Sequence, residues 1–259
     1  MDRATGKYIT FVDGDDYIDE LLFEKAVASM IEHDSDMLNY GFTRCDSIGR
    51  PIRHSRNELA DGKYVVSDYM NYYSEQSEQL KFYHAAWKKM YKNHFLKEAM
   101  KKVDDTVTKG EDLCLTLSFL GMVHDFYNDN SIVGYNYVDR SSSMTHVYDK
   151  LNVQHTGNCI KNILKLSDDD KGWNTILYNE AFNLVMSDCI GCTFEYYGKS
   201  RPLSIVRYFR RLANDGLVSS LFKNGVSGGY FKNNRRTFAD YMVQKSYVRA
   251  LIFRLKKKV

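Results

Sequence analysis

The sequence predicts an α/β domain over residues 1–146, followed by a helical region over residues 147–259. A short β-rich apolar run, YITFV at residues 8–12, reads as a buried strand of a parallel sheet. Residues 17–33 then repeat apolar side chains at helical spacing, and residues 36–42 read as a second strand. A strand, a helix and a strand in this order form a β-α-β unit. The second region shows 3.6-residue spacing with few strand signals.

The remaining elements are expected from local patterns. For the first region we expect a polar hairpin at residues 50–66 with its turn at Asp61-Gly62, a strand-like stretch at 82–91, a short helix capped by Asn93, a helix opened by Glu111 and Asp112, and closing strands at 123–127 and 132–138. For the second region we expect helices at 148–166, 173–197, 201–213 and 236–257.

The composition indicates a folded protein of the cell interior. Of 259 residues, 44% are hydrophobic and 27% are charged, which allows a sizeable core and excludes global disorder. No run of 18 apolar residues and no apolar leader core occur, so we expect neither a membrane span nor a signal peptide. The five cysteines are odd in number and scattered, as in reduced proteins. We therefore expect a cytoplasmic location.

Charge is distributed unevenly along the chain. Residues 201–259 carry 14 Lys and Arg against two Asp, a balance of +12, whereas the other 200 residues carry 22 basic and 31 acidic side chains. The acidic excess in residues 1–200 suits a cation site. The basic rear suits phosphates, an anionic membrane leaflet or, most simply, a solvated helical face. Nothing in the pattern indicates nucleic-acid binding.

Asp13-Gly14-Asp15-Asp16 follows the first predicted strand directly. Ligands of open α/β sheets bind at the carboxyl ends of the strands, where this cluster falls. The glycine between the first two acids lets the backbone turn so that both carboxylates face one point. Carboxylates in this arrangement suit Mg²⁺ or Mn²⁺, which commonly share substrate phosphates with the protein.

Three other interpretations of this cluster were weighed. An EF-hand loop would place Glu24 at its twelfth position, but Ile18 stands where that loop needs glycine. A dehalogenase-like phosphatase also carries D-x-D after a strand, but prefers small residues where this chain has Asp16-Tyr17. A plain Asp-rich turn is common in any fold. From D-x-D alone, the metal site and the plain turn both remain open.

A longer string resembles a known family. ATGKYITFVDGDDYID, residues 4–19, is similar to the metal-site segment of family-2 glycosyltransferases, which have the A-type glycosyltransferase fold. AWKKMY at 86–91 resembles the W-x-K-L-Y stretch of that family, and Glu111-Asp112-Leu113 resembles its E-D motif. Tyr135-Asn136-Tyr137 with Arg140 and Ser143 resembles its weaker Y-x-Y-x-x-R-x-x-S tail. The resemblance covers about residues 3–145 and implies a partial A-type, Rossmann-like sheet.

The resemblance also implies roles for site residues. Asp15 would bind the metal, and Asp13 would contact the metal or the nucleotide ribose. Asp112 would be the general base, with Glu111 beside it. Asp13, Asp16 and Trp87 would contribute to substrate binding, with Trp87 stacking on a sugar or acceptor. The simpler alternatives are helix-start chemistry for Glu111 and Asp112, and core packing for Trp87.

One departure from the family pattern affects the donor site. Members normally begin with a strand-helix-strand segment that binds the nucleotide base, whereas twelve residues precede Asp13 here. We therefore expect a truncated catalytic domain in which residues 8–12 form an exposed sheet edge. A homo-oligomer or another partner would then cover that edge.

Three functions follow from these observations. The first is a glycosyltransferase that moves a sugar from a nucleotide-sugar donor to a polysaccharide or lipid-linked acceptor, inverting and dependent on Mg²⁺ or Mn²⁺. The second is a catalytically inactive remnant that only binds a glycan or a partner, and the third is a metal-dependent phosphatase. The basic C-terminus, residues 254–258, favours peripheral contact with the inner face of a membrane.

Overall fold

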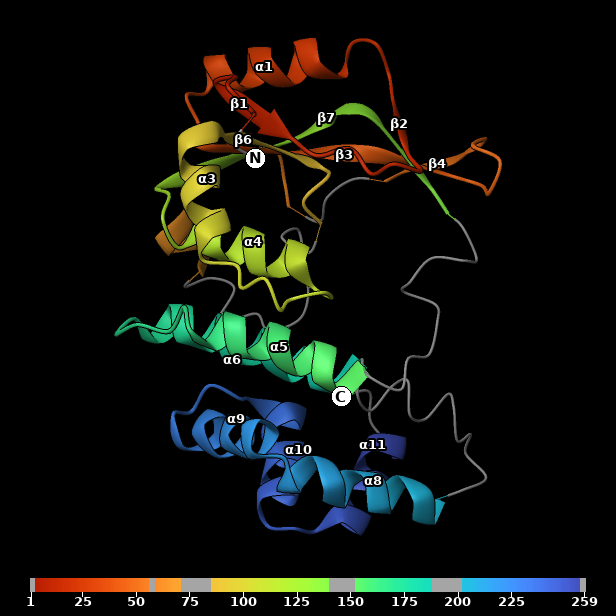
Figure 1. Cartoon of the computed structure of the whole chain (residues 1–259), viewed down its shortest axis with the longest axis vertical. Coiled ribbons are helices and arrows are strands. Elements are labelled where there is room, and N and C mark those ends of the chain that lie inside the picture. Colours follow the sequence, from red (N-terminus) through yellow and green to blue (C-terminus); the bar gives the residue numbers. More distant parts are fainter. Residues whose placement is uncertain (1–2, 56–58, 71–84, 140–151, 188–201, 257–259) are drawn as a thin grey trace. The chain divides into compact units, whose positions relative to one another are not determined.

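The computed structural model describes residues 3–55, 59–70, 85–139, 152–187 and 202–256 (Figure 1). The chain falls into two units. The first comprises Met1–Asp105 with Gly110–Val147, and the second comprises Thr106–Lys109 with Tyr148–Val259.

A mixed seven-stranded sheet forms the centre of the first unit. Its main path runs β1-β6-β3-β7-β2, with β4 paired to β3 and β5 paired to β7. The strands are β1 Tyr8–Thr10, β2 Tyr17–Ile18, β3 Met37–Cys45, β4 Pro51–Ser55, β5 Gly62–Val65, β6 Lys89–Lys92 and β7 Asp125–Val138. Among these, β3 and β7 pair in parallel and every other pair is antiparallel. The expected α/β fold, with strands and helices followed by a helical region, is confirmed.

The first strand differs from the expectation of a buried strand in a parallel sheet. β1 pairs antiparallel with β6, where Ile9 is opposite Tyr91, and it lies at one end of the main path. Its three residues are half-buried. The β-α-β unit is real, but β6 inserts between its two strands because β6 pairs with β3 as well as with β1.

The polar hairpin is also arranged differently. The hairpin is formed by β3 and β4, and the Asp46 carboxylate closes its turn by accepting the backbone N–H groups of Ile48 and Arg50. The expected turn at Asp61-Gly62 does not join two paired strands, because β5 pairs with β7 instead of β4. The Asp61 carboxylate accepts the N–H of Asn130 on β7.

The two closing strands expected near the end of the first unit are one long strand. β7 keeps its parallel pairing to β3 through a bulge: Tyr40 is opposite Asp129, whereas the next residue, Gly41, is opposite Val133. The carboxylate of Asp129 accepts the N–H and the hydroxyl of Ser131, which stabilises the bulge. Such a bulge bends a strand without ending it.

Three helices pack on this sheet: α1 Leu22–Glu32, α3 Asn93–Lys101 and α4 Glu111–Leu120. Figure 1 shows α1 over one face of the sheet and α3 with α4 on the other face. α1 buries Leu22, Ala26 and Met30 in a cluster that includes Tyr135 of β7. The helix begins five residues later than expected, because the residues of β2 pair with β7.

Asn93 does not cap α3 with its side chain. Its amide donates to the carbonyl oxygens of Ala4 and Gly6, and so ties the segment before β1 to the start of the helix. Asn93 is thus a long-range link, and nothing in its local sequence distinguishes that role from a cap.

The second unit consists of helices in its described part: α5 Asn152–Leu164, α6 Lys171–Leu184, α8 Pro202–Asn214, α9 Gly216–Ser227, α10 Asn233–Val243 and α11 Tyr247–Lys256. Its core gathers the buried rings of Phe182, Phe209, Phe222 and Phe238. No helix within the described ranges is long and apolar enough to cross a membrane.

Two helix assignments in this unit were incomplete. The span 236–257 is two helices, because Lys245 adopts a left-handed φ of 58° after α10 ends. α9 was not predicted, although Asp215 is a plain start signal. Its carboxylate accepts the N–H groups of Leu217 and Val218.

Candidate functional site

The acidic residues after β1 form a tight turn. The N–H of Asp16 donates to the carbonyl oxygen of Asp13 at 3.1 Å, which closes the turn around Gly14 and Asp15. A Cβ placed on Gly14 would meet no atom within 4 Å, so open space surrounds the turn. Asp13 and Asp15 are both exposed. The carboxylates of these two residues are therefore accessible to a ligand.

Asp16 attaches this turn to β7. One carboxylate oxygen accepts the Tyr135 hydroxyl at 2.7 Å, and the other accepts the N–H of Val138 at 2.8 Å. The Tyr135 hydroxyl oxygen in turn accepts the N–H of Asp13 at 3.1 Å. Both oxygens of Asp16 are thus engaged by the fold. The geometry supports a role in orienting the turn more strongly than direct contact with substrate.

The carboxylates of the turn and those at the start of α4 interact electrostatically. The pKa of Asp13 is raised from 3.8 to about 6. Partial burial is the largest cause, and the negative charges of Asp112, Asp16, Asp15 and Glu111 add to it. Two of these charges belong to the turn and two to the first turn of α4. The structure therefore brings together the acidic residues that the sequence singled out at two distant positions.

Asp112 is positioned by its helix and by the segment before β6. α4 begins after Gly110, which has a left-handed φ of 79°. Glu111 is exposed, whereas Asp112 is half-buried and its Oδ2 accepts the N–H of Ala86 at 3.0 Å. An acidic residue in a first turn is also favoured by the helix dipole.

Trp87 lies in a group of aromatic rings next to the acidic turn. Its ring stacks on Tyr135 at a centroid distance of 4.5 Å and on Tyr137 at 5.4 Å, and meets the edge of Phe42 at 5.0 Å. It is half-buried and packs against the core of the sheet. Packing against these rings thus explains the position of the Trp87 side chain. Stacking of a sugar on its exposed part remains a prediction.

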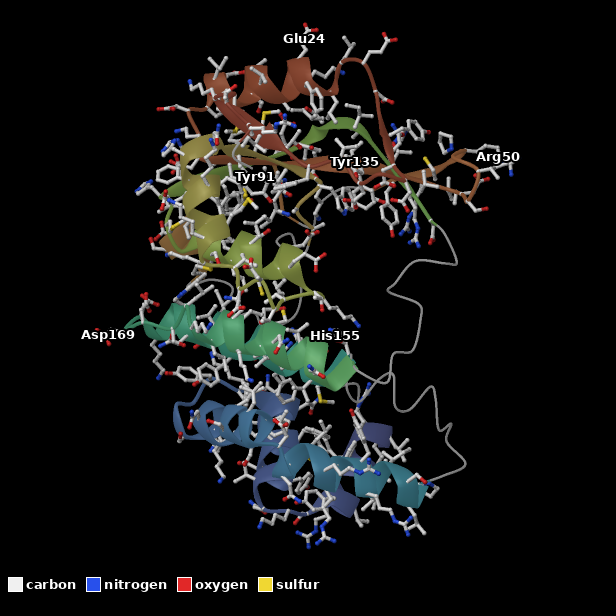
Figure 2. The ribbon with its side chains drawn as sticks, in the orientation of Figure 1. Glu24, Arg50, Tyr91, Tyr135, His155 and Asp169 are labelled. Carbon is white, nitrogen blue, oxygen red and sulfur yellow. The ribbon has the colours of Figure 1, made fainter. Side chains whose placement is uncertain are left out.

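Two residues matter more than the sequence suggested. Tyr135 was noted as part of a weak motif, but its hydroxyl connects Asp13 to Asp16, and Figure 2 shows it inside the sheet layer. Lys89 is fully buried, and its Nζ donates to the carbonyl oxygen of Ala85. The available signal was its place as the lysine of the segment that resembles W-x-K-L-Y. Arg140 and Ser143, from the same weak motif, lie outside the described residues.

A cavity of about 470 Å³ lies elsewhere in the first unit. It is lined by β2, the start of α1 and the part of β7 around Gly134, with Asp19, Glu20 and Lys25 as its charged residues. None of the expected site residues lines it. It is therefore separate from the acidic turn.

The acidic residues fit a cation that is shared with a ligand, but not an all-protein metal site. In the described ranges, no three His, Cys, Asp or Glu side chains are arranged to hold a metal ion. Mg²⁺ typically takes one or two carboxylates and completes its shell with water and substrate phosphates. Asp13 and Asp15 match that smaller requirement, and a cation there would offset the negative charges that, after partial burial, raise the pKa of Asp13.

Fold and site together define a class: an α/β protein with an acidic turn after a strand, facing a carboxylate at a helix start. Residues 1–99 match the family model of Glycosyl transferase family 2. This match spans 99 of the 259 residues, so the first part of the chain is similar in sequence to that family.

Individual proteins agree with this class. The chain is 24% identical over 115 residues to the uncharacterized glycosyltransferase EpsJ of Bacillus subtilis (strain 168), an alignment covering 44% of this chain and 33% of EpsJ. The crystal structure of S. aureus TarS 1–349 in complex with UDP-GlcNAc has a TM-score of 0.67 at 17% identity, covering 98% of this chain and 68% of TarS 1–349. The same TarS fragment alone has a TM-score of 0.63. The chain thus shares the TarS fold and spans a third of its curated relative.

The raised pKa of Asp13 predicts a stability effect. The folded pKa lies above the unfolded value of 3.8, so the ionised form is disfavoured by folding. The resulting penalty is absent below pH 3.8, grows between pH 3.8 and 6, and is complete above pH 6. In EDTA, Asp13→Asn is therefore expected to raise the Tm at pH 7.5 and to leave it unchanged at pH 3.5.

The matched control is Asp105→Asn, at an exposed position outside the cluster. It should change the Tm little at either pH. Thermal unfolding followed by circular dichroism measures both variants. A lower Tm for Asp13→Asn at pH 7.5 would show that the carboxylates do not repel one another as described.

Proposed function

We propose that this chain is a glycosyltransferase that moves a sugar from a nucleotide-sugar donor to a hydroxyl of a polysaccharide or lipid-linked acceptor, with inversion at the anomeric carbon and with a divalent cation. One feature supports the proposal most directly: the acidic turn after β1 and the acidic start of α4 belong to one electrostatic cluster, in which the charge of Asp112 adds to partial burial in raising the pKa of Asp13. The family-2 match over residues 1–99 supports it. UDP-GlcNAc, the ligand of the TarS crystal structure, is the first donor to test.

Asp112 is the general base of this proposal. Its Oδ2 is held by the N–H of Ala86, and its Oδ1 accepts no hydrogen bond from the part of the chain that the structure describes. The free oxygen can accept the proton of an acceptor hydroxyl as that hydroxyl attacks the sugar. A single direct attack assisted by a base inverts the anomeric carbon, and a positioned base contributes about 10²- to 10⁴-fold to rate.

Asp15 and Asp13 would hold Mg²⁺ or Mn²⁺ together with the diphosphate of the donor. When bound, the cation offsets the negative charge that develops on the departing nucleoside diphosphate. Asp16 and Tyr135 keep the turn oriented so that its two exposed carboxylates face the donor. Asp16 thus supports substrate binding indirectly in this proposal, and Trp87 contributes its exposed part to the wall of the site.

Asp112→Asn tests the base. The variant keeps an oxygen for the N–H of Ala86 but cannot take up a proton, so UDP release from UDP-GlcNAc is expected to fall by about 10²- to 10⁴-fold, with UDP affinity retained. Release is measured by a coupled assay and affinity by calorimetry, with Asp105→Asn as the control.

Assays of the wild-type protein distinguish the glycosyltransferase from the two alternatives, the inactive remnant and the phosphatase. Absence of release from every UDP- and GDP-sugar, with UDP or a glycan still bound, would favour the inactive remnant. Inorganic phosphate released from p-nitrophenyl phosphate would favour the phosphatase. Undiminished UDP release by Asp112→Asn would remove Asp112 from the role of base.

The metal is tested by Mn²⁺ titration calorimetry with and without UDP. Binding is expected to be much tighter with UDP, because the diphosphate supplies ligands that two carboxylates lack. It should weaken as pH falls through 6, because protonated Asp13 cannot bind a cation and its pKa is about 6. Asp15→Ala should abolish the heat of binding, whereas Asp105→Ala should not. Unchanged Mn²⁺ binding by Asp15→Ala would refute the metal assignment.

The second unit offers a surface for an anionic membrane leaflet. On α11, Val248, Ile252 and Leu255 share one helical face and are 57%, 47% and 56% exposed. Arg249 and Lys256 lie on the same helix, and neither α8 nor α11 contains an acidic residue. An apolar face flanked by basic residues is typical of helices that lie in a membrane interface. Lys257 and Lys258 lie outside the described residues.

This contact predicts salt-sensitive sedimentation with vesicles containing phosphatidylglycerol. Binding at 50 mM salt should be largely lost at 500 mM, because salt screens the basic residues. Ile252→Asp should also abolish it by placing a charge on the apolar face. Ile31→Asp, at an exposed isoleucine of α1, is the matched control and should bind like the wild type. No sedimentation at 50 mM salt would refute the contact.

A further inference from the structure

We propose that Lys89 is a positioning residue that sets the orientation of the Asp112 carboxylate through the peptide group between Ala85 and Ala86. The inference rests on the proposed function, because Asp112 is the base of that proposal. Lys89 has no role in the site as assembled so far, although its side chain is the only lysine among the largest fully buried side chains of the described residues.

One peptide group connects Lys89 and Asp112. Its carbonyl oxygen, on Ala85, accepts a hydrogen bond from Nζ of Lys89. Its N–H, on Ala86, donates to Oδ2 of Asp112 at 3.0 Å. The C=O and N–H of a trans peptide point in opposite directions, so the negative end of the peptide dipole faces the lysine and its positive end faces the carboxylate. Each hydrogen bond strengthens the other because both polarise the same peptide group in the same direction.

The burial of Lys89 needs an explanation in terms of its amino group. Lys89 is 0% exposed, and burial together with the charge of Lys88 holds its pKa well below the usual value, while Asp112 acts in the opposite direction. Burying an amino group costs free energy that a methionine or leucine of similar length would not. The amino group is instead used to fix the peptide group that holds Asp112.

This arrangement has a consequence for the base. Asp112 lies at the start of α4, where the helix itself fixes only its backbone. Lys89 belongs to β6, a strand of the sheet. The peptide group between them ties the side chain of Asp112 to the sheet, with Oδ2 facing the peptide. Oδ1 of Asp112 is thereby left available for the acceptor hydroxyl of the proposed reaction. A carboxylate held this way loses little orientational freedom when the acceptor binds.

The test is Lys89→Met, which keeps the length of the side chain and removes its hydrogen-bond donor. In ¹⁵N-labelled full-length protein, exchange of the Ala86 amide proton with solvent should accelerate at least tenfold relative to the Tyr91 amide in the same sample. Turnover of UDP-GlcNAc should fall by about 10- to 100-fold in kcat, the usual range for removing a group that orients a catalytic one, with KM for the donor unchanged.

Lys92→Met is the matched control. Lys92 is on the same strand, and its ammonium pairs with Asp36 at 2.9 Å and with Asp34 at 3.3 Å. Removing it costs a half-buried ion pair without touching the Ala85–Ala86 peptide group. It should lower the Tm but leave the relative exchange of the Ala86 amide and kcat close to wild type. Should Lys89→Met fail to fold, Lys89→Leu, which also lacks a donor, is measured in the same way and with the same expected results.

The outcomes separate this inference from the function it rests on. A wild-type protein that turns over no nucleotide sugar overturns the proposed function. An active wild type with unchanged Ala86 exchange, or unchanged kcat, in folded Lys89→Met overturns only the role of Lys89. Faster Ala86 exchange together with a fall in kcat at constant KM supports it.

Discussion

Like charges gather beside the end of the first strand, and the protein holds them there. Asp13 has a pKa near 6 because it is partly buried and because Asp112, Asp15 and other carboxylates lie near it. Without other contacts, the mutual repulsion of these carboxylates would move their side chains apart. Asp16 prevents this at one side by accepting hydrogen bonds from β7, and the N–H of Ala86 prevents it at the other by holding Asp112. Carboxylates held together in this way are the arrangement for which we propose a divalent cation shared with the donor.

The division of work between acidic residues explains why neighbours in sequence have different roles. Asp15 and Asp16 are adjacent, yet one is exposed and the other has both oxygens engaged by Tyr135 and Val138. Asp112 and Glu111 are also adjacent, yet only Asp112 is tied to the segment before β6. In each pair the direction of the side chain is set by the element it packs against. Three of the contacts involved join residues more than 100 positions apart.

Local patterns in the sequence predicted most elements of the first unit and singled out the candidate site residues, whose roles stay predictions. The apolar run before Asp13 and the acidic start of α4 are read from a few neighbouring residues. Strand pairing could not be read that way, because the insertion of β6 between β1 and β3 depends on contacts about 50 to 80 residues apart. The same limit hid Tyr135 and Lys89. The hydrogen bonds of Tyr135 are non-local. Lys89 bonds a carbonyl only four residues away, but a lysine in a short strand resembles an ordinary surface residue until the strand has partners.

The predicted helix boundaries in the second unit were wrong for a different reason. The periodic pattern of residues 236–257 continues across the break at Lys245, since the left-handed residue there is neither glycine nor asparagine. α9 has a good cap at Asp215 and apolar residues at helical spacing, Leu217, Val218, Leu221 and Phe222, so the sequence carried both signals for a helix that was not predicted. Packing around Phe222 and Phe238 decides both helices, and packing is not visible in a local window.

The central claim is that the acidic turn and Asp112 converge on one cation. Paramagnetic broadening by Mn²⁺ with UDP, in ¹⁵N-labelled protein, tests it directly because the effect falls steeply with distance from the ion. The account predicts that substoichiometric Mn²⁺ broadens the amides of Asp15, Asp112 and Ala86 first, and leaves Ile52 of the same unit sharp. Broadening of the turn that leaves Asp112 and Ala86 sharp would contradict it.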